Sequence, residues 1–271
     1  MVNILKMADF VVHSKKILIA LVACLLLFGS CSSPAYVTTL PENVMHAGGE
    51  TPDGRRGTNS IDAMNTSYDK GEYWLELDFC LTSDSHFVCL HDFDAFYSEK
   101  ITGTDIPDLE TFESIRKSTY DYESPTLYSL ISWLDTHPRA VIVTDVKENN
   151  LEFAELLSQT YPEYIDRFAI QIYGRDEYAH VESLGFDKII YTLYKQPLER
   201  YDAKLMREFA QASEKLIAFT YAADADNSES IAEIAEIGLP VYIHTINTVE
   251  ERDFWRGIGV YGFYADYVPT E

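Results

Sequence analysis

The sequence predicts an α/β fold, a closed TIM (β/α)8 barrel, from three observations. Short segments rich in β-branched residues alternate with segments of helical periodicity from Asn43 onward. The count reaches eight strands in roughly 230 residues, which suits a barrel better than an open sheet. The chain has 271 residues and is 46% hydrophobic, enough for one large core. A doubly wound open sheet is the alternative.

The expected elements follow from local patterns. Thr58-Asn59-Ser60 provides a cap for the first helix, in which Ile61, Met64 and Tyr68 have helical spacing. Later strands are short β-branched runs, as in Ala140 to Lys147. The predicted strands cover residues 43–46, 73–79, 140–147, 167–173, 188–193, 216–220, 240–246 and 260–264. The predicted helices cover residues 60–70, 127–136, 151–160, 176–184, 198–213, 228–237 and 249–256.

A β-hairpin and a loop excursion are expected after strand 2. Apolar and polar residues alternate from Trp74 to Asp92, with a two-residue turn at Asp84-Ser85. Pairing Ser83 with His86 places Cys80 opposite Cys89 and Asp78 opposite His91. We therefore expect a Cys80–Cys89 disulfide in an oxidising exterior; two reduced, packed thiols are the alternative. Residues 93–125 lose periodicity and predict a loop with at most one helical turn.

Several ionisable residues fall at or near the C-terminal ends of predicted strands. Catalytic groups of TIM barrels come from these ends. Glu76 and Asp78 also share one strand face, and buried carboxylates need partners. The residues at strand ends are His46, Glu76, Asp78, Asp145 and Lys147. They predict a metal site beside an acid/base group.

Charge and the N-terminal segment restrict the partners. A formal net charge of -23 disfavours nucleic acid and anionic membrane surfaces as electrostatic partners. Lys15-Lys16, the apolar run 17–28 and Gly29-Ser30-Cys31 resemble a bacterial lipoprotein signal. We expect a signal segment at 1–31 with lipidated Cys31, a tether at 32–40 and the barrel domain at 41–271. Cys24 is the alternative lipidation site. The protein would then be exported and anchored in the cell envelope, on the periplasmic or outer surface, and its oligomeric state is left open.

Between Asn43 and Pro269 the chain resembles the glycerophosphodiester phosphodiesterases, a family of the PLC-like phosphodiesterase type of TIM barrel. The motifs that carry the resemblance are His46-Ala-Gly, Asn59-Ser60, Glu76-Leu-Asp78, Leu81-Thr-Ser-Asp84, His91-Asp92, Asp145-Val-Lys147, Thr245-Ile-Asn247 and Gly259-Val-Tyr-Gly-Phe-Tyr-Ala-Asp266-Tyr-Val-Pro269. The resemblance implies an enzyme that hydrolyses a small or lipid-derived phosphodiester to glycerol phosphate and an alcohol. Attack by water and attack by the substrate's own hydroxyl are both open.

The resemblance also implies roles for single residues. His46 and His91 would be the acid/base pair, and Lys147 would lie near the phosphate. Glu76, Asp78 and Asp145 would bind a divalent cation, and three carboxylates without cysteine suit Ca²⁺ or Mg²⁺. Tyr173 and Asn247 end strands and His244 stands where the family commonly has Trp, so these three are pocket candidates.

One departure from the family pattern concerns the phosphate. The family usually has an arginine after the first histidine, but this chain has Ala47. Arg55 or Arg56 in the adjacent loop could supply the missing charge.

Two other functions are considered. A glycoside hydrolase would use Glu76 and Asp145 as its carboxylate pair. A non-catalytic surface lipoprotein that binds a phosphorylated polymer would need neither histidine.

Overall fold

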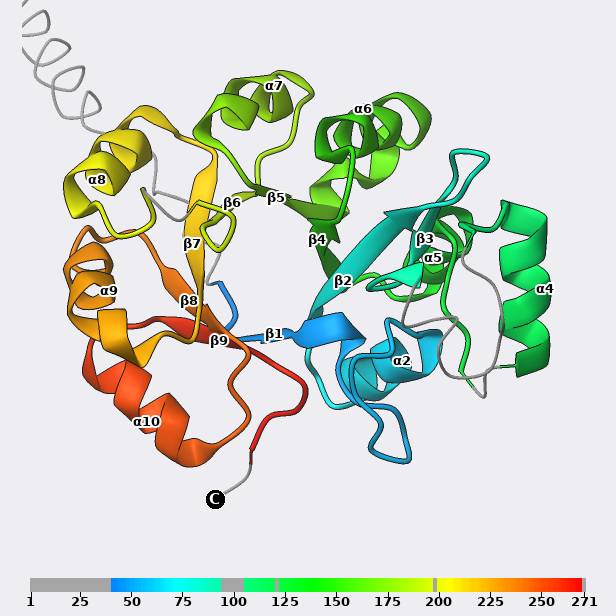
Figure 1. Cartoon of the computed structure of the whole chain (residues 1–271), viewed down its shortest axis with the longest axis horizontal. Coiled ribbons are helices and arrows are strands. Elements are labelled where there is room, and N and C mark those ends of the chain that lie inside the picture. The colour runs from blue at the N-terminus through cyan, green and yellow to red at the C-terminus, as the bar shows by residue number, and fades with distance from the viewer. Residues whose placement is uncertain (1–39, 94–104, 120–121, 197–198, 270–271) are drawn as a thin grey trace, which may run out of the picture. The chain divides into compact units, whose positions relative to one another are not determined.

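A closed barrel of eight parallel strands forms the centre of the protein (Figure 1). The computed structural model describes residues 40–93, 105–119, 122–196 and 199–269. The barrel closes because β1 pairs in parallel with both β2 and β9. Its strands are β1 (Asn43–Met45), β2 (Trp74–Leu81), β4 (Val141–Val146), β5 (Phe168–Ile172), β6 (Ile189–Thr192), β7 (Leu216–Ala222), β8 (Val241–His244) and β9 (Gly262–Ala265). The predicted TIM barrel is confirmed.

Helices surround the barrel, as Figure 1 shows. The helices that connect parallel strands are α2 (Ile61–Asp69), α5 (Leu127–Thr136), α6 (Asn150–Thr160), α7 (Tyr178–Ser183), α8 (Ala203–Ala212), α9 (Ser228–Ala235) and α10 (Val249–Gly257). At the start of α2, the hydroxyl of Ser60 accepts a hydrogen bond from the backbone N–H of Ala63. At the start of α5, the hydroxyl of Thr126 accepts one from the backbone N–H of Ser129. Such caps satisfy backbone donors that a helix start would otherwise leave unpaired.

Alternation along β2 separates the core from the site. Leu75, Leu77 and Phe79 are fully buried and pack in the main hydrophobic cluster with residues of the surrounding helices. Glu76 and Asp78, which lie between them in sequence, therefore point to the opposite face of the strand, the barrel interior. The period of two thus places two carboxylates inside the barrel without breaking the apolar layer outside it.

The β-hairpin exists, but its register differs from the prediction by one residue. Strand β3 (Phe87–Cys89) runs antiparallel to β2, with Phe79 opposite Cys89 and Cys80 opposite Val88. The predicted pairs Cys80–Cys89 and Asp78–His91 are therefore wrong. A shift of one residue moves side chains to the other face of a strand, so the two cysteines lie on opposite faces and are free and buried.

The turn explains the shift. It holds three residues instead of two, because the backbone N–H of Thr82 donates to the carbonyl of His86 at 2.9 Å. Ser85 closes the turn with a φ of 66°, the left-handed residue that three-residue hairpin loops require. The side chains of Thr82 and Asp84 bond within the same turn at 2.6 Å.

The segment after the hairpin holds a helix where the sequence predicts a loop. Helix α4 (Leu109–Thr119) has eleven residues, so the expectation of at most one helical turn is wrong. The carboxylate of Asp108 accepts from the backbone N–H of Thr111 at its start. Phe112 is fully buried and packs with Cys80 and Val88 on the face of the hairpin opposite to Phe79 and Cys89. Residues 94–104 and 120–121 lie outside the described residues.

The predictions for the N-terminal segment, including Cys24, Cys31 and most of the tether, also lie outside the described residues. Residues 41–271 form one compact unit. In the part of the chain that the structure describes, no helix has the length and hydrophobicity that crossing a membrane requires.

Candidate active site

Three carboxylates from two neighbouring strands meet inside the barrel. Strands β2 and β4 pair in parallel with Asp78 beside Asp145, and Glu76 lies two residues before Asp78 on the same face. One carboxylate oxygen from each of the three residues lies within 4.8 Å of the others. Oxygen ligands at this density suit a hard divalent cation. The donor set therefore fits Ca²⁺ or Mg²⁺.

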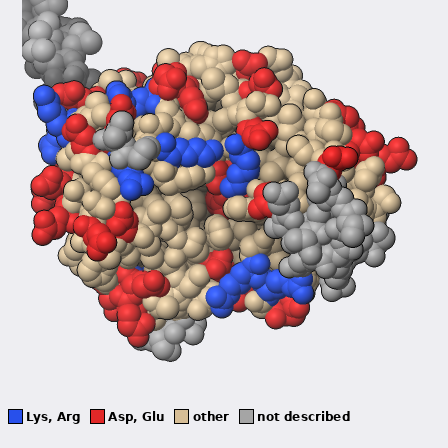
Figure 2. All heavy atoms as spheres, viewed as in Figure 1, with Lys and Arg blue, Asp and Glu red and all other residues tan. Residues whose placement is uncertain are grey.

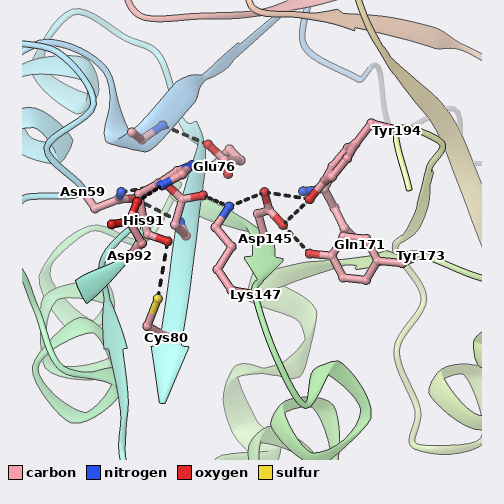
Figure 3. Close-up of polar contacts among 12 residues, drawn as sticks. Asn59, Glu76, Cys80, His91, Asp92, Asp145, Lys147, Gln171, Tyr173 and Tyr194 are labelled. Atoms are coloured by element: carbon pink, nitrogen blue, oxygen red, sulfur yellow. Dashed lines mark hydrogen bonds and ion pairs between the residues drawn. The ribbon is translucent and has the colours of Figure 1, made fainter. Parts of the chain in front are cut away.

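Lys147 extends from the end of β4 between the two strands (Figure 3). Its Nζ lies 2.5 Å from Oδ1 of Asp78 and 2.8 Å from Oδ2 of Asp145. Burial opposes the charge of the ammonium, but the charges of the two aspartates outweigh burial and raise the pKa of Lys147. The side chain is thus a fixed cation beside the carboxylates.

Glu76 is buried next to the other two carboxylates of the cluster. Burial and the nearby charge of Asp78 raise its pKa to about 8. The backbone N–H of Ala47 donates to its Oε2 at 2.9 Å, and the charge of His46 also favours the carboxylate, but neither restores an ordinary pKa. A divalent cation beside the three carboxylates would favour the ionised form.

His46 follows β1 and is held by a carboxylate from the other end of the chain. Its Nδ1 lies 2.7 Å from Oδ1 of Asp266, just beyond β9. Asn247 fixes Asp266 in turn, because its amide donates to Oδ2 at 2.7 Å and its carbonyl oxygen accepts from the backbone N–H at 2.9 Å. Burial lowers the pKa of His46, but the bond to Asp266 and the charge of Glu76 raise it to about 9. With Nδ1 engaged, Nε2 is the atom for proton transfer.

His91 follows β3 and is paired in a similar way in a more open setting. Its Nδ1 lies 2.6 Å from Oδ2 of Asp92, and its side chain is 64% exposed. The register shift places Leu90 beside Asp78, with the Leu90 N–H donating to the Asp78 carbonyl at 3.1 Å. His91 is the residue that follows Leu90, so it lies next to the carboxylates at the edge of the cavity.

These groups line one cavity of about 350 Å³. Figure 2 shows a hollow at the centre of this face, with Lys and Arg side chains on two of its sides. The side of the cavity formed by β1, β2, β4 and the hairpin carries the ionisable groups, whereas the side formed by β5 to β9 carries mainly uncharged groups. The lining residues are His46, Glu76, Asp78, His91, Asp145, Lys147, Gln171, Thr192, Tyr194, Ala222, His244 and Tyr264.

The comparison with family models decides the assignment. A model of the glycerophosphoryl diester phosphodiesterase family matches residues 47–270, which is most of the chain. The chain belongs to the glycerophosphoryl diester phosphodiesterase family. It is therefore an enzyme of the phosphodiester hydrolase class. This membership favours phosphodiester hydrolysis over the glycoside hydrolase and over the non-catalytic polymer-binding protein.

Solved structures of glycerophosphodiester phosphodiesterases share the fold. The enzyme from Parabacteroides distasonis is 18% identical, with a TM-score of 0.63 over 83% of this chain and 92% of that one. The enzyme from Thermotoga maritima is 16% identical, with a TM-score of 0.62 over 84% and 95%. A phosphodiesterase from Oleispira antarctica, solved with the product sn-glycerol-3-phosphate, is 15% identical, with a TM-score of 0.62 over 84% and 94%. No curated protein matches the chain.

Two of the predicted pocket residues of this phosphodiesterase bond to other residues of the site. The hydroxyl of Tyr173 donates to Oδ1 of Asp145, and its side chain is buried. Asn247 bonds to Asp266, as described above, and neither Tyr173 nor Asn247 is among the described cavity-lining residues. Tyr173 and Asn247 thus hold Asp145 and Asp266 in place, and substrate contact by these two residues stays a prediction. His244 does line the cavity.

Other supports of the phosphodiesterase site were not predicted. Asn59 donates from its amide to Oδ2 of Asp78 at 2.8 Å and accepts from the Asp78 backbone N–H at 2.9 Å. Asn59 reaches this position with a φ of 49°, a conformation that asparagine tolerates better than most residues. Tyr194 donates to Asp145 at 3.2 Å. The signals in the sequence were the Asn59-Ser60 motif and the closing motif that contains Asp266.

The two arginines considered as substitutes for the family arginine stack on tyrosines instead. The guanidinium of Arg55 lies 5.4 Å from the ring centre of Tyr122, and that of Arg56 lies 4.5 Å from the ring centre of Tyr267. Neither arginine is among the described residues that line the cavity. Among the described residues that line the cavity, Lys147 is the one with a lysine or arginine side chain.

Proposed function

We propose that the protein is a divalent-metal-dependent glycerophosphodiester phosphodiesterase that releases glycerol phosphate and an alcohol. The observation that carries this proposal is the arrangement around one cavity of three clustered carboxylates and two histidines, each paired through Nδ1 with an aspartate. The Oleispira antarctica phosphodiesterase, whose structure contains sn-glycerol-3-phosphate, supports the choice of product.

In this proposal Glu76, Asp78 and Asp145 hold Ca²⁺ or Mg²⁺. The bound cation would polarise a phosphoryl oxygen and offset negative charge on the diester. Lys147 lies against two of these carboxylates, so its ammonium is in place to bind a second phosphoryl oxygen. Tyr173, Tyr194 and Asn59 keep the carboxylates oriented through their hydrogen bonds.

The two histidines divide the proton transfers. One removes a proton from the attacking water or substrate hydroxyl, and the other gives a proton to the departing alkoxide. The bond to Asp266 and the charge of Glu76 raise the pKa of His46 and favour its protonated form, so we assign it the role of acid. His91, which is exposed at the edge of the cavity, is assigned the role of base.

Turnover of a diester panel in the presence and absence of metal tests the proposal. The panel contains glycerophosphocholine, glycerophosphoethanolamine and teichoic-acid fragments, and the readout is released phosphomonoester. Activity should disappear in EDTA and return with Ca²⁺ or Mg²⁺. The changes His46→Ala and His91→Ala should each lower kcat by about 10²–10⁴-fold.

His180→Ala is the matched control. His180 is also paired with a carboxylate, since its Nε2 lies 2.8 Å from Glu155, but it belongs to α7 outside the barrel. This variant should keep wild-type turnover. Full activity in EDTA, or in both site variants after a folding check, would show that the proposed mechanism is wrong.

We also propose that the enzyme is an exported lipoprotein whose mature chain begins at Cys31. The support is the sequence Gly29-Ser30-Cys31-Ser32-Ser33 after an apolar run. A tether of residues 32–40 would hold the barrel within about 30 Å of a membrane. Intact mass of membrane-extracted protein should show an acylated N-terminus, and Cys31→Ser should abolish it. A mature chain that starts at Cys24 would contradict the choice of site.

A further inference from the structure

A buried polar atom without a partner lies on the uncharged side of the cavity. His244 ends β8 and lines the cavity, where the rings of Tyr194 and Tyr264 flank it edge-on with ring centres 5.8 and 6.1 Å away. Its Nε2 atom is buried and has no hydrogen-bond partner in the structure. Aromatic edges and faces exclude water without offering the hydrogen bond that the imidazole nitrogen lacks.

An unpaired buried nitrogen costs free energy, so its presence next to a substrate cavity needs a reason. The side chains around His244 do not supply a hydrogen-bond partner. Tyr194 already donates to Asp145, and Ala222, which pairs with His244 in the sheet, has no polar side chain. The imidazole lines the cavity, so a molecule bound there can supply the missing hydrogen bond. The partner must then come from the cavity.

The state of His244 limits the chemistry of that partner. Burial and the charge of His46 lower its pKa to about 4, so the ring is neutral where the enzyme would work. A cation bound by the carboxylates would add to this effect. A neutral imidazole offers one donor and one acceptor, which matches an alcohol hydroxyl and does not favour an ionised group.

We propose that His244 determines specificity by forming a hydrogen bond with a hydroxyl of the glycerol part of the substrate. This inference rests on the proposed diesterase function and adds the orientation of the substrate. The phosphate lies toward Lys147 and the carboxylates, and the glycerol lies toward β6 to β9. Thr192 on β6 and Gln171 on the adjacent strand β5 also line the cavity and offer further uncharged polar groups.

Two diesters that differ in hydroxyl groups test the inference. Glycerophosphocholine carries glycerol hydroxyls, whereas bis(p-nitrophenyl) phosphate has none. His244→Phe keeps a flat ring but removes both nitrogens. It should lower kcat/KM for glycerophosphocholine by about 10- to 100-fold, the cost of one lost hydrogen bond in a closed site, and change the aryl diester by less than about twofold. His244→Gln, which restores a donor and an acceptor, should recover part of the loss.

The pH profile separates recognition from proton transfer. Because the ring is neutral throughout, the ratio of wild-type to His244→Phe activity should stay constant from roughly pH 6 to pH 8. A ratio that changes across this range would assign His244 to acid/base chemistry and overturn the proposal. An equal loss on both diesters would overturn it as well, because that is the result of a purely structural role.

A binding experiment keeps the inference testable independently of turnover. Calorimetry measures the affinity for sn-glycerol 3-phosphate, which carries glycerol hydroxyls, and for inorganic phosphate, which has no glycerol. His244→Phe should weaken the binding of sn-glycerol 3-phosphate by about 10-fold or more and leave the binding of inorganic phosphate unchanged. Equal affinities for wild type and variant would refute the role of His244. Wild-type binding without hydrolysis of any diester would instead refute the proposed function.

Discussion

The two proposed acid/base histidines share one kind of partner in two different settings. Each is bonded through Nδ1 to an aspartate, at 2.7 Å for His46 and 2.6 Å for His91. Asp266 is 12% exposed and is bracketed by Asn247, whereas Asp92 is 43% exposed. Since solvent screens exposed pairs strongly, the two aspartates should differ in how much they control their histidines.

Matched substitutions of the two aspartates measure this difference. Asp266→Asn should lower kcat by about 10–100-fold with little change in KM, because His46 loses both its orientation and part of its positive charge. Asp92→Asn should lower kcat by about threefold or less, because water can replace an exposed carboxylate. Steady-state kinetics on glycerophosphocholine gives both numbers. Equal losses would show that burial of the pair is irrelevant to the mechanism.

The strand-end rule located the centre of the site but not its supports. His46, Glu76, Asp78 and Asp145 could be predicted because parallel strands bring their C-terminal ends to one edge. Asp266 also follows a strand, but its bond to His46 could not be predicted, because it joins residues 220 positions apart and depends on how the barrel closes. The same holds for the bond between Tyr173 and Asp145, which joins residues 28 positions apart at the ends of neighbouring strands.

Two elements show why local pattern was insufficient near the hairpin. The two-residue turn followed from Asp84-Ser85, yet side-chain bonds of Thr82 favoured a three-residue turn and moved β3 by one position. Helix α4 had a usable signal, since Asp108 precedes Leu109, Phe112 and Ile115 at a spacing of three. Its few apolar positions were obscured by the polar residues around them. The periodic helices and strands elsewhere had long patterns and were predicted to within a few residues.

The corrected register predicts two free thiols with unequal roles. Cys89 is fully buried in the main core, while the thiol of Cys80 donates to the carbonyl of Leu90 at 3.1 Å. Cys89→Ser should destabilise the protein by about 1–3 kcal/mol, because a hydroxyl without a partner enters an apolar site. Cys80→Ser should cost less than about 1 kcal/mol, because serine can keep the bond to Leu90. Urea unfolding of both variants checks this order.

Thiol titration provides a second check of the hairpin. After exposure to air, unfolded protein should show both thiols of the barrel as reactive. The folded protein should react slowly with a disulfide reagent, since burial raises the pKa of Cys80 to about 12 and little thiolate forms. A Cys80–Cys89 bridge in a non-reducing peptide map would contradict the observed register.

For the molecule as a whole, the buried acidic cluster makes stability depend jointly on pH and metal. Glu76 has an ordinary pKa of 4.5 and a folded pKa of about 8, because of burial and Asp78. Between these values the folded state holds a proton that the unfolded state has released, so the free energy of unfolding falls as pH rises. The pKa of His46 is raised from 6.5 to about 9, so the free energy of unfolding also falls as the pH rises between these two values. The pKa of Asp145 is lowered, so its contribution to stability is fully present above its ordinary pKa of 3.8 and stays constant over this range.

In EDTA the protein should therefore lose stability steadily from about pH 5 to pH 9. Added Ca²⁺ or Mg²⁺ should restore stability most at the alkaline end, because the cation binds the ionised form of Glu76. Denaturant unfolding at several pH values, with and without metal, measures both effects. Glu76→Gln should flatten the pH dependence in EDTA and weaken the response to metal. An unchanged slope in this variant would mean that other groups cause the dependence.

The bond between His46 and Asp266 crosses the seam where β1 meets β9, and this has a consequence for biosynthesis. A ribosome delivers the histidine early and its aspartate some 220 residues later. A nascent chain that stops before β9 lacks both the closing strand and the aspartate, so it should bind neither metal nor diester productively. Ribosome-bound chains arrested before Gly262 should be inactive, while those arrested well after Asp266, with a linker that spans the exit tunnel, should hydrolyse glycerophosphocholine. For a chain that is translocated unfolded, the hydrolase would be assembled only on the far side of the membrane, away from the diesters of the compartment that made it.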